Sequence, residues 1–274
     1  MRVLVCVKRV PAPGAKINIT ADGLAVDTAY LAFTTSPHEE CAVEEAVQLV
    51  ERHGGESTVL TLGPAEADEQ LRYAASIGVN KAVLLPIDAA TSVGGDWDPQ
   101  RTAAAITTAI RDLEAADGPF DLILFGNESA DSGNFQVGVR VAYGLGRPVV
   151  NGIKGIEVDG DNARARRESD AGVEVYAVPM PAVLGVKEGI NLPRYPTLKG
   201  RLASKKVEVA HADPHGEPGG QQMSALVQAA EQASQTLVLG HGPEAAASVV
   251  DLLEELGILT VSYTHLTLPT SDLV

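Results

Sequence analysis

The strongest chemical signal in this sequence is a loop rich in Gly, Ser and Asn that runs from Gly126 to Gly138. A strand-like apolar stretch ends at Gly126, and a helix-like pattern begins at about Phe135. Free backbone N–H groups in such a loop, and the positive end of the helix after it, suit a phosphate group. The loop is longer than the roughly two to six residues usual between a strand and a helix. The sequence therefore predicts an anion site here, with an ordinary solvated loop as the alternative.

Two other segments place small or polar residues at a strand end or a helix start. In the segment 36–39, Ser36 is predicted to cap a helix, Pro37 suits the first helical position, and Glu39 completes a capping box. A helix start without a ligand is an equally good interpretation of this segment. In 61–64 a strand runs directly into a helix through a glycine. Ligands of open α/β sheets bind at the carboxyl ends of strands, where the strand order reverses, so we expect the three segments to meet there.

The other reactive side chains show no catalytic arrangement. The sequence lacks the GxxxxGK[ST] phosphate loop, a GxGxxG after the first strand, and the GxSxG elbow of hydrolases. The histidines are scattered: His53 ends a predicted helix, and His211, His215 and His241 lie in predicted loops. A nucleotide held without a catalytic group favours ligand binding or electron carriage over covalent chemistry.

Composition restricts the partners and the compartment. Hydrophobic residues make up 45% of the chain, and 36 acidic against 21 basic residues give a net charge of −15. Such a surface repels phosphate backbones and anionic lipids, so neither nucleic acid nor a membrane is expected as a partner. Cys6 and Cys41 form no CxxC pair, and no metal site is expected. The first strand begins at Arg2, which leaves no room for a targeting peptide and favours a reducing, cytoplasmic location.

The elements that must position these residues alternate along the first two-thirds of the chain. Short, continuous runs of Val, Leu and Ile predict buried parallel strands at 2–10, 57–63, 81–86 and 121–126. Ala-rich periodic runs predict helices at 39–52, 65–77 and 100–113. In the first helix the valines are expected to face the core, and Glu40, Glu44 and Glu45 are expected to face solvent. This order predicts an α/β fold with a doubly wound, mostly parallel, Rossmann-like sheet.

The chain changes character after about Val149. Residues 164–169 and 173–178 predict a β-hairpin insertion, and 181–187 predicts another buried strand. We expect a domain over 1–209, a Pro/Gly-rich linker over 210–223 and a C-terminal extension over 224–260, which packs on a partner or back on the domain. Within the extension, 224–233, 236–240 and 243–256 predict helix, strand and helix. The last residues, 261–274, resemble a translated sequencing adapter, and we hypothesise that they are not native.

Four segments give the chain a resemblance to the β (small) subunit of electron-transfer flavoproteins, from Arg2 to about Val209. These segments are Val5-Cys6-Val7-Lys8-Arg9-Val10-Pro11, Ala42-Val43-Glu44-Glu45-Ala46, the loop Gly126 to Gly138, and Asn191-Leu192-Pro193-Arg194-Tyr195-Pro196-Thr197-Leu198-Lys199-Gly200. The hairpin residues 167–170 also resemble the family signature, with Ala171 where a glycine is more usual.

The resemblance implies a non-enzymatic electron carrier that forms a heterodimer with a larger α subunit. The α subunit would hold most of a shared FAD, and this chain would bury a structural AMP. Electrons would pass from flavin dehydrogenases, such as the acyl-CoA dehydrogenases of fatty acid oxidation, to a quinone-linked oxidoreductase. A bacterial, cytoplasmic location follows from the same resemblance.

The family's cofactor contacts can be carried over by position. They would be Cys6, Ser36, Pro37, His38, Glu39, Leu62, Gly126, Asn127, Glu128, Ser129, Ala130, Asp131, Ser132, Gly133, Asn134, Phe135, Gln136 and Val137. Backbone amides between Asp131 and Gln136 would hold the phosphate, and His38 would approach the isoalloxazine ring.

The segment 191–202 corresponds to the family's recognition loop. Leu198 would be the anchor that enters a dehydrogenase pocket, beside Tyr195 and flanked by Arg194, Lys199 and Arg201. An apolar side chain among cations makes a small hot spot with an electrostatic rim. Without the resemblance, a basic surface connection is the simpler interpretation.

Three other functions compete with this interpretation. In a bifurcating or quinone-linked branch of the family, a second FAD replaces AMP. A stand-alone adenine-nucleotide sensor of the universal-stress type has the same general fold, but the hairpin and the 191–202 segment argue against it. An adenylating enzyme would need an SGGxDS-type loop, which the sequence lacks.

Overall fold

The computed structural model describes residues 1–88, 97–230 and 236–259. The chain divides into a larger unit, Met1–Gln228, and a smaller unit, Ala229–Val274. The described part contains no helix that is long and apolar enough to cross a bilayer.

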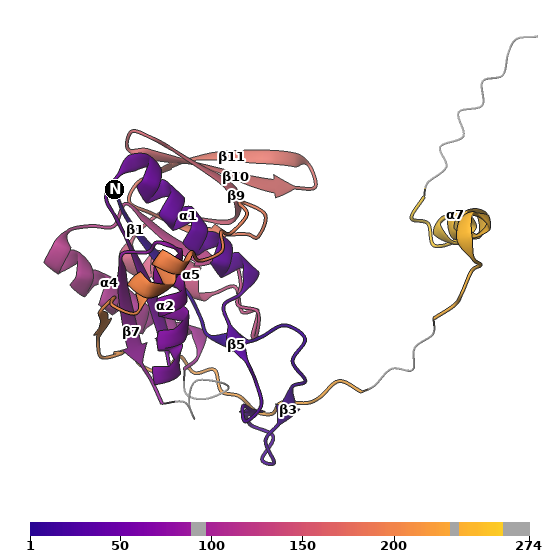
Figure 1. Cartoon of the computed structure of the whole chain (residues 1–274), viewed down its shortest axis with the longest axis horizontal. Coiled ribbons are helices and arrows are strands. Elements are labelled where there is room, and N and C mark those ends of the chain that lie inside the picture. The colour runs from indigo at the N-terminus through magenta and orange to yellow at the C-terminus, as the bar shows by residue number, and fades with distance from the viewer. Residues whose placement is uncertain (89–96, 231–235, 260–274) are drawn as a thin grey trace, which may run out of the picture. The chain divides into compact units, whose positions relative to one another are not determined.

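A nine-stranded sheet forms the centre of the larger unit (Figure 1), in the order β11-β10-β9-β12-β8-β1-β6-β7-β13. The parallel part comprises β1 (Arg2–Cys6), β6 (Glu56–Gly63), β7 (Lys81–Pro86), β8 (Leu122–Gly126), β9 (Val149–Asp159), β12 (Ala182–Val186) and β13 (Val209–His211). The predicted hairpin is β10 (Asn162–Ser169) and β11 (Gly172–Pro179), antiparallel at one end of the sheet. The predicted mostly parallel α/β fold is confirmed.

The order of the strands reverses between β1 and β8. The chain builds outward from β1 through β6 to β7, and then returns to place β8 on the other side of β1. Cys6 pairs with Phe125, and Gly126 pairs with Val186, so the carboxyl ends of β1, β8 and β12 lie side by side. This edge is where an open α/β sheet binds its ligands.

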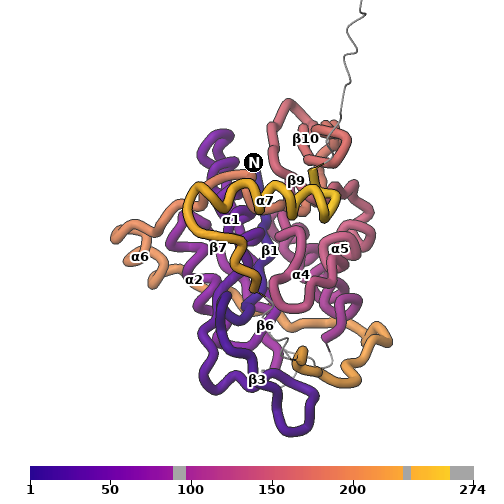
Figure 2. Tube along the Cα trace, turned by 90° about the vertical axis from the view of Figure 1, so that its right-hand side faces the viewer, coloured from indigo at the N-terminus to yellow at the C-terminus, as the bar shows by residue number. Residues whose placement is uncertain are grey.

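Helices cover both faces of the sheet, as Figure 2 shows. Along β1, Val3 and Val5 pack with α1 (Pro37–His53) and α2 (Asp68–Ile77), while Leu4 and Cys6 pack with α4 (Pro99–Asp117) and α5 (Val137–Leu145). Alternate side chains of a strand point to opposite faces, so one continuous apolar run fills both layers. A short helix, η1 (Ala65–Ala67), precedes α2.

Smaller elements complete the larger unit. The stretch after β1 forms two short antiparallel pairs, β2 (Val10–Pro11) with β5 (Phe33–Thr34) and β3 (Asn18–Ile19) with β4 (Val26–Asp27). The predicted strand over 2–10 therefore ends at Cys6, and Val10 belongs to β2. The segment 191–198 leads into α6 (Leu198–Ser204).

Two predictions for the C-terminal region are wrong. Residues 224–230 are not helical, because the Leu226 N–H donates to the Gly23 carbonyl at 2.8 Å instead of to its own chain four residues back. Residues 236–240 form no strand and have no pairing strand in the described part of the chain. The helix predicted at 243–256 is present as η2 (Gly242–Glu244) and α7 (Ala245–Glu255). Residues 231–233 and the tail 261–274 lie outside the described residues.

Gly126, the last residue of β8, allows α1 to begin against the ligand-binding edge of the sheet. A Cβ at this position would lie 2.7 Å from Cγ of Glu39, 3.1 Å from its backbone nitrogen and 3.3 Å from Cβ of His38. The first turn of α1 therefore packs directly on the backbone of β8, and any side chain at residue 126 would push it away.

Replacement of Gly126 by alanine is expected to destabilise the fold by about 1–3 kcal/mol, because the new methyl group meets the backbone of α1. Urea unfolding of the purified protein measures the change. Gly63→Ala is the matched control: this glycine also ends a strand, and the nearest atom to an added Cβ is the methyl carbon of Ala67 at 3.1 Å. Equal losses in the two variants would contradict a special role for Gly126.

Candidate functional site

An open pocket of about 400 Å³ lies at the carboxyl ends of β8 and β12. Its volume is within the usual range for small-molecule sites. Its lining residues come from the start of α1, the loop after β8 and the turn after β12: Ser36, Pro37, His38, Glu128, Ser129, Ala130, Asp131, Ser132, Gly133 and Glu188. The structure thus brings together two of the segments that the sequence places at this edge.

The wall formed by α1 is fixed by the predicted capping box, which is confirmed. The Glu39 N–H donates to Oγ of Ser36 at 3.2 Å, and the Ser36 N–H donates to Oε2 of Glu39 at 2.9 Å. Pro37 takes the first helical position. Because both partners are buried, this exchange fixes the direction in which His38 leaves the helix.

Glu39 is a buried acid below the pocket wall. Burial raises the pKa of its carboxyl group to about 8, although hydrogen bonds from Ser36 and the backbone of Lys8, and the charge of Lys8, act in the opposite direction. The group is therefore mostly neutral at pH 7.

Two contacts hold the His38 ring and determine which of its nitrogens carries a hydrogen. Its Nδ1 accepts the backbone N–H of Glu188 at 2.8 Å, so that nitrogen carries no hydrogen. Its Nε2 lies 3.2 Å from Oε1 of Glu128 and donates to it. The ring thus joins the three elements that line the pocket. Its predicted approach to a flavin stays a prediction.

The loop after β8 is fixed by an ion pair that the sequence interpretation did not identify. Nζ of Lys8 lies 2.6 Å from Oδ2 of Asp131. Burial raises the pKa of Asp131, but Lys8 and the hydrogen bonds from Ser132 and Ser129 outweigh it, and the pKa lies below its usual value. Lys8 lies two residues after β1, next to the point where the strand order reverses. That position in the sequence could have identified Lys8 as a candidate site residue.

The predicted phosphate-binding residues lie where α5 begins. Side chains cap α1, α4 and α6, whereas α2, α5 and α7 have no side-chain cap; at α5 the Oε1 of Gln136 accepts from Arg140. The N–H groups of the first turn of α5 are therefore available to a ligand or to water. Phe135, just before it, has a left-handed φ of 55° and is 54% exposed.

The other predicted contact residues serve the scaffold or lie away from the pocket lining. Cys6 is buried in the core, and burial raises the pKa of its thiol. Leu62 and Val137, the first residue of α5, both pack against the apolar cluster between the sheet and the layer of α4 and α5. Oδ1 of Asn127 accepts the Gly152 N–H at 2.8 Å, which joins the loop to β9. Asn134 and Phe135 are exposed beyond the lining residues. No group of His, Cys, Asp and Glu in the described residues could hold a metal ion.

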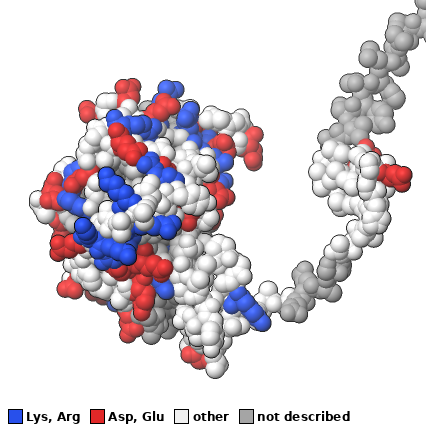
Figure 3. Space-filling model, viewed as in Figure 1, with Lys and Arg blue, Asp and Glu red and all other residues white. Residues whose placement is uncertain are grey.

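The segment 191–198 displays three large apolar side chains on the surface. Leu192 is 90% exposed, and the pair closest to α6 in the sequence, Tyr195 and Leu198, is 88% and 76% exposed. Lys199 and Arg201 are exposed beside them, and Figure 3 shows Lys and Arg side chains gathered around α6 and α2 on this face. The exposed pair therefore has a cationic border on a protein that is acidic overall.

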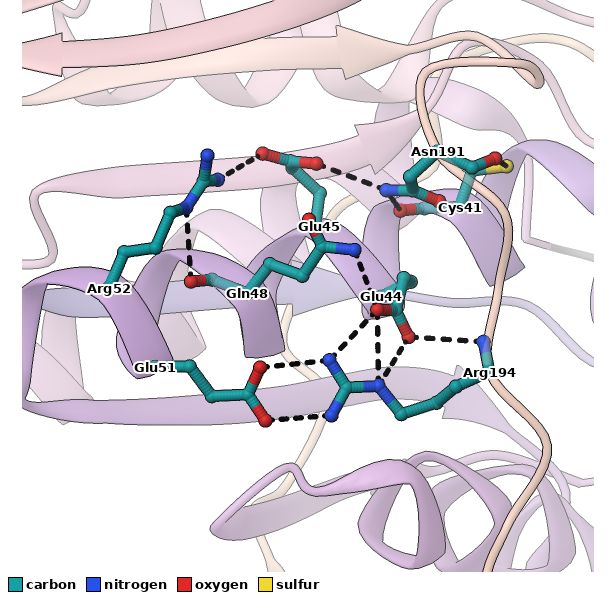
Figure 4. Close-up of polar contacts among 8 residues, drawn as sticks. All are labelled: Cys41, Glu44, Glu45, Gln48, Glu51, Arg52, Asn191 and Arg194. Atoms are coloured by element: carbon teal, nitrogen blue, oxygen red, sulfur yellow. Dashed lines mark hydrogen bonds and ion pairs between the residues drawn. The ribbon is translucent and has the colours of Figure 1, made fainter.

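The expectation that Glu44 and Glu45 face solvent is wrong. They are 2% and 4% exposed, and Glu40 is half-buried, because residues 191–194 cover this face of α1. Arg194, which was predicted to flank the anchor, is bound by Glu44 at 2.9 Å and by Glu51 at 2.7 Å (Figure 4). Its charge is thus already neutralised within the chain.

Replacement of Glu39 by Gln is expected to flatten the dependence of stability on pH. Between pH 4.5 and about 8 the folded protein holds a proton on Glu39 that the unfolded chain has released, so its free energy of unfolding falls as the pH rises through this range. Glutamine keeps the capping oxygen and does not titrate. Urea unfolding at pH 5.5, 7 and 8.5 should show the stability of the unsubstituted protein falling relative to Glu39→Gln; parallel profiles would refute the buried-acid assignment.

Comparison with known proteins identifies the family. The model of the electron transfer flavoprotein domain matches residues 23–215. The electron transfer flavoprotein subunit beta of Syntrophomonas wolfei is 38% identical over 77% of this chain and 79% of its own. The proteins of the same name from Bacillus subtilis and Megasphaera elsdenii are 34% and 32% identical, over 75% and 78% of this chain and 76% and 78% of theirs. These matches show that the chain belongs to the electron transfer flavoprotein beta-subunit family.

Proposed function

We propose that this chain, an electron-carrier subunit, buries a structural AMP in the pocket beside α1 and shares an FAD with an α subunit. The observation that carries the proposal is the pocket itself: it lies where the strand order reverses, and the helix that starts beyond its loop has no side-chain cap. Both features are typical of nucleotide sites in doubly wound folds.

The charges around the pocket support a nucleotide more than a free phosphate. Glu128 and Glu188 line the pocket, and Lys8 pairs with Asp131. A phosphate would have to use the backbone N–H groups of the loop and of the first turn of α5. The carboxylates would suit the donor groups of a nucleoside, such as ribose hydroxyls.

The redox chemistry would belong to the flavin, and this chain would hold and shield it. His38 and Glu128 are half-buried at the pocket wall and are fixed by their contacts with each other and with Glu188. They are the residues that we expect nearest to a ring held between the two subunits.

Electron donors would dock on Leu198 and Tyr195. A flavin dehydrogenase, of which acyl-CoA dehydrogenases are the expected example, would receive Leu198 in an apolar pocket and face Lys199 and Arg201 with carboxylates. Electrons would then pass to a quinone-linked oxidoreductase. Because Glu44 and Glu51 already pair with Arg194, its charge would not face the partner. The cationic border is therefore limited to the α6 side.

The smaller unit would pack on the α subunit. In α7, Val249 and Val250 are 42% and 44% exposed, and Leu256 just after the helix is 61% exposed. A helix with this apolar surface is stable only when another surface covers it. A cytoplasmic location is part of the same proposal.

A second FAD in place of AMP is the second candidate. The pocket is open, so an FAD could place its adenylate half at the loop and extend outward past His38.

Nucleotide content decides between these proposals. Co-expression with the α subunit, followed by release and chromatography of bound nucleotides, should give one AMP and one FAD per heterodimer. Asp131→Asn should lower the AMP content because the pair with Lys8 is lost, while Asp117→Asn, an exposed ion-pair residue, should not. Two FAD and no AMP would transfer the assignment to the second candidate, and no nucleotide with no complex would contradict both.

Leu198→Ala should weaken coupling to the electron donor without affecting the fold. The side chain is largely exposed, so its loss removes little buried area, whereas a docking anchor contributes strongly to binding. With a purified acyl-CoA dehydrogenase as donor, the KM for the dehydrogenase should rise about tenfold or more at unchanged flavin content. An unchanged KM, or an equal loss of folded protein, would count against the docking role.

A further inference from the structure

We propose that Glu44 and Glu45, buried on α1, are positioning residues that hold the docking segment, residues 191–198, in its binding conformation through Arg194 and Asn191. The inference rests on the proposed docking function. It assigns a role to two carboxylates that lie below the docking surface and do not form part of it.

Glu44 binds the segment through Arg194. Its carboxylate accepts from the Arg194 backbone N–H at 3.2 Å, from Nε at 2.9 Å and from the terminal nitrogen Nη2 at 2.9 Å. Gln48, one turn along α1, donates to it at 2.7 Å, and Glu51 binds the outer edge of the same guanidinium at 2.7 and 2.9 Å. The arginine is thus held between two turns of one helix (Figure 4).

Glu45 binds the beginning of the segment through Asn191. Nδ2 of Asn191 donates to Oε2 of Glu45 and to the Cys41 carbonyl, both at 3.0 Å, and Sγ of Cys41 lies 3.7 Å from the Asn191 carbonyl. Arg52 pairs with the other oxygen of Glu45 at 2.8 Å. The two adjacent carboxylates therefore bind the segment at positions three residues apart.

The segment is fixed at its other end as well. Oγ1 of Thr197 caps α6 by accepting the Gly200 N–H at 3.0 Å. A side chain at Gly200 would overlap the carbonyl oxygen of Ser76, so α6 lies directly on the end of α2. Arg72 of α2 donates to the Ser204 carbonyl at the end of α6 at 3.0 Å. Tyr195 and Leu198 lie between these fixed ends.

The part nearest the pocket is attached to the same helix. Glu188 lies three residues before Asn191. Its N–H donates to His38 in the first turn of α1. From the pocket to the docking segment, this stretch therefore follows α1 and contacts it repeatedly.

A purely structural role would not favour carboxylates at these positions. A buried charge costs free energy unless its partners compensate for it, and an apolar residue on this helix face would pack without that cost. The partners of Glu44 and Glu45 outside α1, within the described residues, are Arg194 and Asn191 of this segment. An ordered segment loses less conformational entropy when a partner binds, which is the advantage that would offset the cost.

The test is Glu44→Gln in the flavin-loaded heterodimer. The substitution keeps the size of the side chain and removes the charge that binds Arg194. Amide hydrogen exchange in peptides covering 190–198 should become faster. The KM for an acyl-CoA dehydrogenase should rise at least about fivefold, with kcat and flavin content unchanged. Glu56→Gln is the matched control, because Glu56 pairs with Arg2 at 3.1 Å at the opposite edge of the sheet, and it should change neither quantity.

Variants of Arg194, the half-exposed partner of Glu44, test the same inference in case Glu44→Gln does not fold. Arg194→Gln should repeat both effects, and Arg194→Lys, which keeps the charge, should restore part of the affinity. If Leu198→Ala raises the KM but the Glu44 and Arg194 variants match the unsubstituted protein in KM and exchange, the positioning role is overturned while the docking function stands. If Leu198→Ala has no effect, the docking function itself fails.

Discussion

The contact of Glu39 with the bare backbone of Gly126 is the constraint on which the rest of the site depends. It allows α1 to start at the edge where the strand order reverses, so that Ser36 and His38 face the loop after β8. The direction of α1 then decides where its later turns lie. Because Glu44 and Glu45 follow on the same helix, the face that carries the docking segment is fixed by the contact that forms the pocket wall.

Ion pairs connect both the loop after β8 and the segment 191–198 to the scaffold. Lys8 binds the pocket loop through Asp131, and Glu44 binds the docking segment through Arg194. Leu198 is largely exposed, as its proposed docking role requires, so its side chain adds little to the stability of the segment. Its attachment therefore has to come from groups that do not compete for the partner, and ion pairs with partly buried carboxylates provide it.

The sequence predicts what depends on neighbours along the chain. Within residues 1–209, the buried strands, the helices and the capping box of Ser36 and Glu39 follow from local patterns, and these are present. Features that depend on contacts with distant residues are not predicted by these local patterns. The helical periodicity places Glu44 in solvent because nothing in it shows that Arg194, 150 residues later, covers that face. The Lys8–Asp131 pair and the extended path at Leu226 are missed for the same reason, since each is decided by a partner far along the chain.

The charges that line the pocket favour one orientation of the proposed nucleotide. Glu128 and Glu188 place negative charge among the lining residues, and Lys8 is already paired with Asp131. The phosphate of a nucleotide is therefore favoured only on the side of the loop and the first turn of α5, where backbone N–H groups are available. The raised pKa of Glu39 keeps that buried carboxyl mostly neutral at pH 7, so it adds little negative charge behind the pocket wall. In the proposed complex a nucleoside part would donate to these carboxylates, so a pocket lined by acids is compatible with a nucleotide.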